Sequence, residues 1–235
     1  MALIQVEKVS KIYDDNSVPV HALRDVSLNI DKEEFTAIVG PSGSGKTTLL
    51  NVIGGLDKPT SGTILVDGTD ISTYKTDEMI NFRLHHIGFV FQAYNLIPVF
   101  TARENVEFIM LLQGISKQER ESRAIDLLKS VGLGDRINSK PSELSGGQQQ
   151  RVAVARALAS KPSFVLADEP TANLDSVTAN HLLDLMEDLN DKYKMTFVFS
   201  THDARVIKRA HRVVTLHDGS VEKDEQKKKI TNDAD

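Results

Sequence analysis

The chain has 235 residues, 40% of them hydrophobic and 26% charged, which is the composition of an ordinary folded protein with one substantial core. Its formal net charge of −5 argues against nucleic acid as the main partner, and the absence of cysteine excludes disulfide bonds and thiolate metal sites. No apolar run approaches the roughly 18 residues that span a bilayer, and the residues after Met1 do not have the pattern of a signal peptide. We therefore expect a protein on the cytoplasmic side of the cell membrane.

The first quarter of the chain predicts strands around a glycine-rich loop. Apolar residues recur with strand-like alternation from Ile4 to Val9 and from Leu23 to Ile30, and residues 14–17 predict the turn between them. A short apolar strand, Phe35 to Val39, then leads into the loop, and a helix follows at 46–53. Strand, loop and helix in this order are the setting that a phosphate-binding loop requires.

The remainder predicts a helical insertion between two α/β halves. Another strand is expected at 62–66, and the region from about 75 to 140 is mostly helical, with a capping box that begins at Ser116. After residue 141 strands and helices alternate, which predicts a mostly parallel sheet covered by helices on both faces. The expected strands are 163–167, 196–200 and 212–216, and the expected helices are 147–159, 176–192 and 203–210. The charged residues 222–235 predict a flexible tail.

The glycine-rich loop fits the pattern G-x-x-x-x-G-K-[ST]. Its glycines let backbone N–H groups point at phosphates, and the N-terminus of the next helix favours negative charge. We therefore expect Lys46 to reach the β- and γ-phosphates of a nucleotide and the hydroxyl of Thr47 to bind Mg²⁺. The other nucleotide-binding candidates in this segment are Gly40, Ser42, Gly43, Ser44, Gly45 and Thr48.

An apolar strand that ends in two carboxylates is the second candidate. Asp168 closes the strand and suits the Mg²⁺ shell, whereas Glu169 is placed to polarise an attacking water. Alone, such a pair is as typical of a solvated turn. The phosphate loop upstream favours the catalytic interpretation.

A helix that opens with two glycines is the third candidate. Ser145 reads as the N-cap of this helix, and the bland interpretation is an ordinary cap with a softened first turn. A glycine in a helix interior costs roughly 1 kcal/mol, and less near the helix end. The cost favours a backbone that approaches a ligand. The residues concerned are Ser145, Gly146, Gly147 and Gln148.

Together these motifs resemble the ATP-binding subunit of an ABC transporter over about residues 2–221. The resemblance implies an α/β P-loop NTPase core of the ABC type with a mostly parallel sheet, an N-terminal antiparallel β subdomain and a helical subdomain at about 93–160. It places Lys46 and Thr47 in the Walker A loop, Asp168 and Glu169 at the end of Walker B, and residues 144–148 in the family signature.

The resemblance also implies roles for residues that mean little alone. Gln92 matches the Q-loop glutamine, which senses Mg²⁺ and contacts the transmembrane partner, and His202 matches the switch histidine at the γ-phosphate. Tyr13 matches the aromatic residue that stacks on adenine, and Asp175 closes the D-loop, where Asn173 replaces the usual small residue. By itself, Tyr13 is more typical of a partly buried surface aromatic, and His202 is equally typical of a helix-capping or core histidine.

The family hydrolyses ATP with Mg²⁺ between two subunits paired head to tail, and the resemblance implies the same here, with a second copy of this chain. Finer motifs at 54–62, 87–92, 95–98, 101–106 and 148–151 resemble the lipoprotein-releasing and macrolide-exporting (LolD- and MacB-type) subgroup. This predicts export, extrusion or lipoprotein release through a separate transmembrane permease.

Other classes of P-loop ATPase share parts of this motif set. An ATPase subunit of an ABC importer stays open. The short, heptad-free spacing between the motif sets disfavours DNA-repair ATPases with long coiled coils, and a single cassette disfavours ribosome-associated relatives that carry two. The signature disfavours P-loop kinases and GTPases. The apolar residues Leu96, Ile97, Val99 and Phe100 predict either a contact with the permease or part of the core of the helical insertion.

Overall fold

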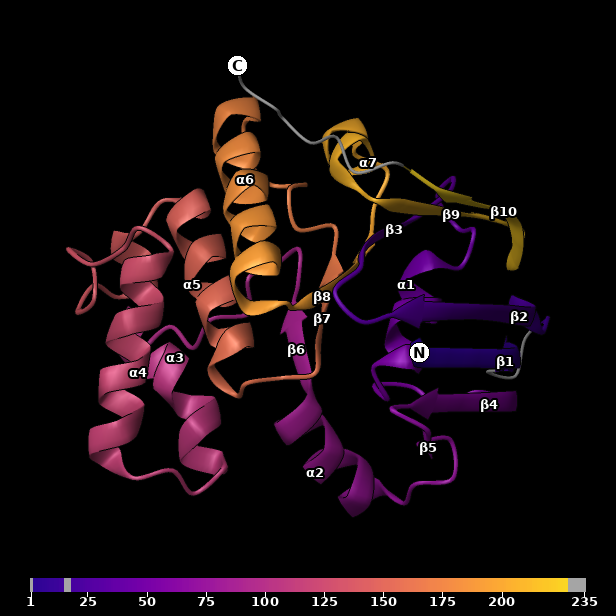
Figure 1. The fold of residues 1–235 in the computed structure, drawn as a ribbon, viewed down its shortest axis with the longest axis horizontal. Helices are drawn as coiled ribbons and strands as arrows, with labels where there is room; N and C mark the ends of the chain where they lie inside the picture. Colours follow the sequence, from indigo (N-terminus) through magenta and orange to yellow (C-terminus); the bar gives the residue numbers. More distant parts are fainter. Residues whose placement is uncertain (1, 15–17, 228–235) are drawn as a thin grey trace.

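The structure is a computed structural model that describes residues 2–14 and 18–227. An N-terminal antiparallel sheet, a central sheet and a set of helices form its layers (Figure 1). The strands are β1 (Ala2–Tyr13), β2 (Val20–Asp31), β3 (Phe35–Val39), β4 (Ser61–Val66), β5 (Thr69–Asp70), β6 (Ile87–Val90), β7 (Phe164–Asp168), β8 (Thr196–Ser200), β9 (Arg212–His217) and β10 (Ser220–Gln226). The helices are α1 (Lys46–Ile53), α2 (Thr76–His86), α3 (Ala102–Leu112), α4 (Lys117–Ser130), the 3₁₀ turn η1 (Pro141–Glu143), α5 (Gly146–Ala159), α6 (Ser176–Tyr193) and α7 (Ala204–Arg209).

The central sheet has the strand order β10-β9-β3-β8-β7-β6. Its β9, β3, β8, β7 and β6 strands pair in parallel, and β10 pairs antiparallel with β9. Successive residues of a strand point to opposite faces, so Phe164 and Leu166 pack on the side of α1, whereas Val165 packs on the side of α5 and α6. The expected mostly parallel sheet with both faces covered is confirmed.

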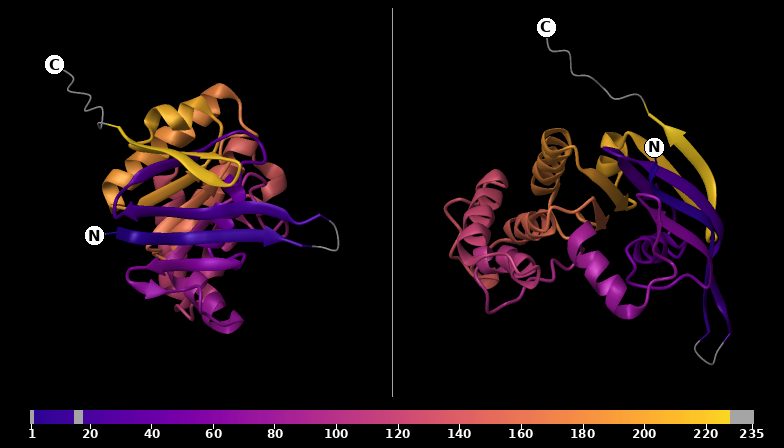
Figure 2. Two further views of the ribbon diagram at one scale, coloured as in Figure 1. Left: turned by 90° about the vertical axis from the view of Figure 1, so that its right-hand side faces the viewer. Right: turned by 60° about the horizontal axis from the view of Figure 1, so that its bottom comes forward.

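The N-terminal sheet, in the order β2-β1-β4-β5, packs over α1 and encloses it against the central sheet. Along β1, Leu3, Ile4, Val6 and Val9 are buried, whereas Glu7 and Lys8 are exposed. Figure 2 shows β1 and β2 extending past the end of β4. Residues 15–17 of the turn expected after β1 lie outside the described residues.

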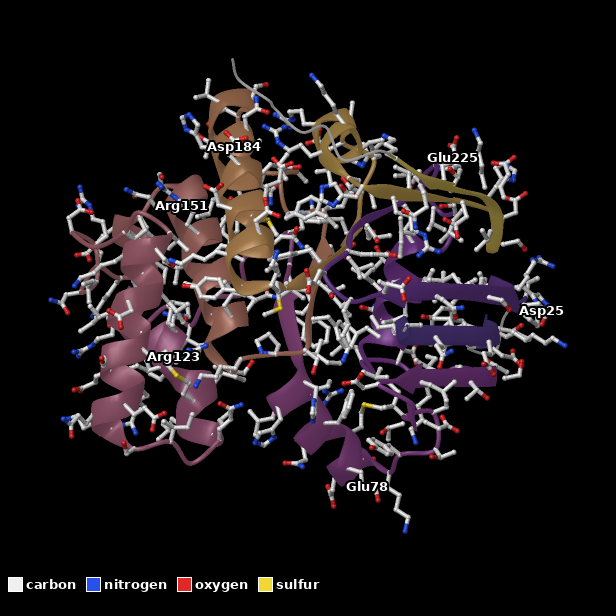
Figure 3. The ribbon with its side chains drawn as sticks, viewed as in Figure 1. Asp25, Glu78, Arg123, Arg151, Asp184 and Glu225 are labelled. Atoms are coloured by element: carbon white, nitrogen blue, oxygen red, sulfur yellow. The ribbon has the colours of Figure 1, made fainter. Side chains whose placement is uncertain are left out.

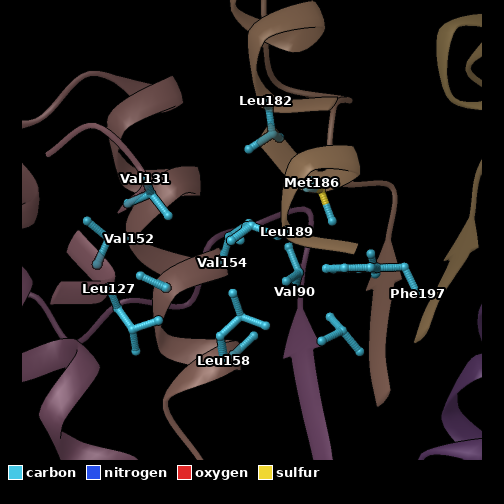
Figure 4. Packing of buried hydrophobic residues seen from close by; sticks show 14 of the residues in the cluster. Val90, Leu127, Val131, Val152, Val154, Leu158, Leu182, Met186, Leu189 and Phe197 are labelled. Carbon is cyan, nitrogen blue, oxygen red and sulfur yellow. The ribbon is translucent and has the colours of Figure 1, made fainter. Parts of the chain in front are cut away.

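On the opposite face of the central sheet, α3, α4 and α5 form the helical layer, with α6 and α7 beside it (Figure 1). Figure 4 shows Leu127, Val152 and Leu158 from this layer packing toward Met186 of α6 and Phe197 of β8. One apolar cluster therefore joins the helical insertion to the sheet. None of the helices in the described ranges is long and apolar enough to cross a membrane.

Two segments differ from the expected elements. Ile87–Val90 lies in the region expected to be mostly helical, yet it forms β6 in parallel with β7. Four residues are too few to show a period, and the pairing with a distant strand decides the structure. Residues 222–226, expected in the flexible tail, complete β10, because the β9 ladder and the Arg212–Asp224 ion pair at 2.7 Å hold charged residues at the sheet edge. The rest of that expected tail, 228–235, lies outside the described residues.

Candidate functional site

The glycine-rich loop between β3 and α1 adopts a conformation that only glycine fits at two positions. Gly45 has φ of 101°, and a Cβ there would lie 2.5 Å from the carbonyl oxygen of Ala22. Gly40 has φ of 152°, and its Cβ would lie 2.2 Å from the carbonyl oxygen of Leu216. The loop therefore packs backbone to backbone against β2 and β9, which fixes the direction of its N–H groups.

Lys46 and Ser44 give this loop the chemistry of an anion site. The ammonium of Lys46 donates to the carbonyls of Gly40 and Pro41, both at 2.9 Å, so its charge is held over the loop. Within the described part of the chain, the buried hydroxyl of Ser44 has no hydrogen-bond partner, and no side chain caps the N-terminus of α1. Unpaired donors beside a fixed cation fit a polyphosphate.

The end of β7 meets this loop at the carboxyl edge of the parallel sheet. The hydroxyl of Thr47 donates to Asp168 Oδ1 at 3.1 Å. Such an oxygen pair suits Mg²⁺, which usually takes one or two carboxylates and completes its shell with phosphate and water. Among the described residues no cluster of three or more acidic or histidine side chains could hold a metal alone. The donor set fits a Mg²⁺ ion that arrives with a nucleotide.

Glu169 follows Asp168 and has φ of 44°, a left-handed conformation that is unusual for a non-glycine residue. Its Oε1 lies 2.6 Å from His202 Nδ1, and its Oε2 accepts from the hydroxyl of Thr201 at 3.1 Å. Because an ionised carboxylate only accepts, the proton of the imidazole in this contact sits on Nδ1. Strained backbone of this kind collects at functional sites.

An open cavity of about 670 Å³ gathers most of the predicted site residues. Predicted residues that line it are Tyr13, Gly40, Ser42, Gly43, Gly45, Lys46, Thr47, Thr48, Gln92, Glu169 and His202. Ser44 is buried within the loop, and Asp168 does not line the cavity but accepts a hydrogen bond from Thr47, which does. In the described ranges, Ser145 to Gln148 and Asp175 are not among the residues that line it.

The signature segment instead forms a second surface with the start of α6. Ser145 caps α5 in a capping box with Gln148, its Oγ accepting the Gln148 N–H at 3.3 Å. A Cβ on Gly147 would lie 2.1 Å from a methyl carbon of Thr178, whose hydroxyl donates to Asp175. Close packing within the chain is therefore a reason for this glycine that sequence reasoning did not see.

Sequence reasoning also missed the residues that hold the segment after Gln92. Tyr94 and Asn95 are both left-handed, with φ of 51° and 50°. The guanidinium of Arg156, on α5, donates to both of their carbonyls, at 2.8 Å to Tyr94 and 2.5 Å to Asn95. Asn173 donates to the carbonyl of Gln92 at 3.0 Å. The only signal in the sequence for these hydrogen bonds to Tyr94 and Asn95 was a charged residue, Arg156, in a mostly buried helix.

A further contact missed from the sequence joins the loop after β7 to the loop after β8. Thr171 donates to Asp203 Oδ2 at 2.6 Å, and Arg205 pairs with the same oxygen at 2.7 Å. Burial of the Asp203 carboxyl opposes its ionisation, but hydrogen bonds from Arg205 and Thr171 outweigh burial and lower its pKa to about 2. The ionised Asp203 therefore stabilises the folded protein and links two segments beside the cavity.

We expect Asp203→Asn to lower the free energy of unfolding by about 2 kcal/mol at pH 7, because the unfolded carboxyl has a pKa near 4 and the folded one near 2. A lowered pKa stabilises the folded state fully above about pH 4, and that stabilisation is lost as the pH falls toward about 2. Urea unfolding of wild type and variant should differ by this amount at pH 7 and converge below pH 4. A matched change in an exposed ion pair, Asp135→Asn beside Arg136, should have little effect. A constant gap down to pH 3 would contradict this assignment.

A second cavity, of about 890 Å³, lies between α4, α5 and α6. Arg123 on α4, labelled in Figure 3, lines it and donates to the carbonyls of Leu158 and Ala159, which end α5. Acidic and basic side chains share its walls, and none of the predicted nucleotide-site residues is among the residues that line it. We therefore assign the function to the cavity at the phosphate loop.

Comparisons with known proteins agree with the geometry. The family model described as ABC transporter matches residues 23–172. The chain is 47% identical over 219 residues to the lipoprotein-releasing system ATP-binding protein LolD of Legionella pneumophila, with 93% of this chain and 96% of LolD covered. It is 46% identical to the ABC transporter ATP-binding protein MJ0796 of Methanocaldococcus jannaschii over 228 residues, 95% of this chain and 97% of that protein.

Two solved structures of MJ0796 are similar to this fold. A dimeric structure of the cassette has a TM-score of 0.88 and 45% identity, and covers 96% of this chain and 99% of that chain. A dimeric post-hydrolysis state bound to ADP and Pi has the same TM-score and coverage at 44% identity.

Proposed function

This chain belongs to the ABC transporter family as one of its ATP-binding, ATP-hydrolysing subunits, and on that premise we propose that two copies close head to tail around ATP and so drive a separate transmembrane permease. One observation carries the proposal. The cavity holds the phosphate loop, Glu169 and His202, yet the signature residues Ser145 to Gln148 form a different surface. A second copy would bring that surface to the open side of the cavity.

Within one copy, we propose that Lys46 and the N-terminus of α1 hold the phosphates of ATP, together with the loop residues from Gly40 to Thr48. The cradle of N–H donors and the unpaired Ser44 hydroxyl support this role. Tyr13, which also lines the cavity, would stack on adenine. Mg²⁺ would be held by Thr47, Asp168 and Gln92, and when bound it would neutralise phosphate charge.

Hydrolysis would depend on Glu169 and His202. The Glu169 carboxylate would accept a proton from water, and the hydrogen bond from His202 Nδ1 would hold that carboxylate in position. The opposite edge of the imidazole would then face the terminal phosphate. The 75% exposed side chain of His202 leaves it free to meet a ligand there.

Closure would come from the second copy. The N-terminus of α5 carries a partial positive charge. In the closed dimer it would face the N-terminus of α1 in the other copy, and the two helix ends would offset the charge of ATP from both sides. Asp175, beside the signature through Thr178, would lie in the same interface. The dimeric MJ0796 structures support this pairing. Loss of phosphate after hydrolysis would remove the attraction between the two copies. ATP binding and hydrolysis would therefore switch the dimer between a closed and an open state, and this change could do work on a partner.

We propose that the partner is a permease at the membrane and that this chain sits peripherally on its cytoplasmic face. The relatives named as lipoprotein-releasing ATP-binding proteins support export or lipoprotein release as the work performed.

We further propose that residues 2–221 form one ATP-binding domain, with the helical subdomain at about 93–160. The apolar cluster that α3, α4 and α5 share with the central sheet, whose strands also contribute to the cluster around α1, supports one domain.

The permease would dock on the segment 96–100, next to Gln92. Asn105 holds this segment in place, its Oδ1 accepting the N–H of Ile97 at 2.7 Å and its amide donating to the carbonyls of Ile97 and Phe100, each at 3.2 Å. Within this segment, the Val99 residue is 72% exposed. An apolar surface braced in this way suits a helix of a membrane partner.

We expect Ile97→Glu to weaken capture of the proposed permease partner by about tenfold or more, because a charge in an apolar contact costs more than about 1.4 kcal/mol. Basal ATP hydrolysis should stay unchanged, since Ile97 does not line the nucleotide cavity. Capture of the permease is measured by pull-down from detergent extracts with the tagged subunit, and basal ATP hydrolysis is measured by phosphate release. Tyr193→Glu, at an exposed aromatic residue on the far end of α6, is the matched control. Undiminished capture by the Ile97 variant would remove this segment from the interface.

A further inference from the structure

The phenol of Tyr13 is held by more than its own strand. Its hydroxyl donates to Asp57 Oδ2 at 2.8 Å and also interacts with the hydroxyl of Thr48. The ammonium of Lys11 lies 4.8 Å from the centre of the Tyr13 ring and 2.7 Å from Asp57 Oδ1. The ring is therefore fixed at its hydroxyl, and one of its faces is covered by a cation.

Asp57 is itself fixed to the end of α1. Its N–H donates to the carbonyl of Asn51, on that helix, at 3.2 Å, and its Oδ1 accepts the N–H of Lys58 at 2.8 Å. Lys11 also donates to the carbonyl of Lys58 at 2.9 Å. The carboxylate of Asp57 thus has both oxygens engaged, one toward Tyr13 and one toward Lys11.

Helix α1 begins at the phosphate loop and ends just before Asp57. Its eight residues, Lys46–Ile53, span about 12 Å. Tyr13 belongs to the N-terminal sheet, whereas Lys46 is the first residue of α1, directly after the loop that follows β3 of the central sheet. The hydrogen bond from Tyr13 to Asp57 therefore connects an aromatic ring of the N-terminal sheet to α1. The same helix begins at the phosphate loop, which follows β3 of the central sheet.

We propose that Asp57 is a positioning residue for nucleotide binding, which sets the Tyr13 ring at a fixed span from the phosphate loop and keeps the ring face opposite Lys11 ready for the base. The proposal rests on the proposed nucleotide site and names a residue that acts through Tyr13 without touching the ligand. A ring that is already ordered loses less conformational freedom when a base stacks on it, so affinity rises.

The effect should appear only for ligands that carry a base. We expect Asp57→Ala to weaken ATP binding by about tenfold and to leave the binding of inorganic tripolyphosphate unchanged, because the phosphate loop keeps its own contacts. Titration calorimetry of the full chain with each ligand gives both dissociation constants. Asp57→Asn, which keeps the shape and loses the charge, should show a smaller loss in the same direction.

Asp67→Ala is the matched control, since Asp67, directly after β4, pairs at 2.9 Å with Lys32, directly after β2, and both side chains are well exposed. It should alter neither constant. An equal loss of ATP and tripolyphosphate in Asp57→Ala, or no loss of either, would overturn the proposal. Wild type that binds ATP no more tightly than tripolyphosphate would instead contradict the base site at Tyr13, whatever Asp57 does.

Two further readouts separate positioning from general stability. In a Tyr13→Phe background the hydroxyl is gone, so Asp57→Ala should weaken ATP binding by much less than tenfold; the same tenfold loss there would overturn the proposal. Burial and the hydrogen bond to Asp57 raise the pKa of Tyr13. The chain has four tyrosines and no tryptophan, so ultraviolet titration should show one tyrosine ionising at lower pH in Asp57→Ala, and an unchanged profile would count against the proposal.

Discussion

Replacing Glu169 with glutamine should slow ATP hydrolysis by about 100-fold or more while ATP affinity stays close to that of wild type. An amide of the same shape cannot take a proton from water, but it still fits between His202 and Thr201, which lie 2.6 and 3.1 Å from the carboxylate oxygens. Phosphate release gives the rate, and calorimetry gives the affinity. Because bound ATP then persists, the variant should also accumulate as a closed dimer in the presence of ATP.

The position of Glu169 makes this expectation specific. Glu169 directly follows β7, its backbone is left-handed, and it lines the same cavity as Lys46. Glu187→Gln is the matched control. Glu187 lies on α6, forms an ion pair at 3.1 Å with Arg209 on α7, and is not among the cavity residues. A Glu169→Gln protein that stays monomeric with ATP at high concentration in gel filtration would contradict the head-to-tail closure.

Replacing Lys46 with alanine should weaken ATP binding by about 100-fold. Lys46 is 9% exposed, and its ammonium is held over the loop by the carbonyls of Gly40 and Pro41. Hydrogen bonds from a charged donor contribute about 1.5–3 kcal/mol each, so a factor of 100, about 2.7 kcal/mol, corresponds to the loss of one or two such bonds to phosphate. Calorimetric titration with ATP measures the change.

Lys46→Arg tests whether charge alone suffices. A planar guanidinium cannot take the place of a compact ammonium held between two carbonyls, so we expect a substantial loss of affinity in this variant too. Lys32→Ala, which removes only the exposed pair with Asp67, should bind ATP normally. Thermal unfolding monitored by circular dichroism should show that each variant is folded. Unchanged ATP binding by Lys46→Ala would contradict the phosphate-loop assignment.

Much of the site was predictable because its key features are local. The phosphate loop is eight consecutive residues, and its glycines, lysine and threonine can be read without knowing the fold. Charged residues gather at the periphery, as Asp25, Glu78 and Glu225 do in Figure 3, while apolar residues alternate along strands. Alternating strands and helices predicted the parallel sheet for the same reason, since each element carries its own period.

Contacts between distant segments were beyond such reasoning. The strand β6 exists because Ile87–Val90 pairs with β7, more than seventy residues later, and β10 exists because β9 and Arg212 hold a charged edge. No local pattern relates Asp57 to Tyr13, or Arg156 to Tyr94, because these side chains meet only after the sheets and helices have packed.

The identity of the chemistry was thus written in short motifs, whose spacing decides which backbone groups can face a phosphate. The arrangement of that chemistry was decided in three dimensions. Packing placed the signature residues on a surface apart from the cavity and placed Asp57 between the base platform and the helix of the phosphate loop. The reason is physical: a hydrogen bond or ion pair needs its partners within about 3 Å, and only the folded chain brings residues from separate elements that close.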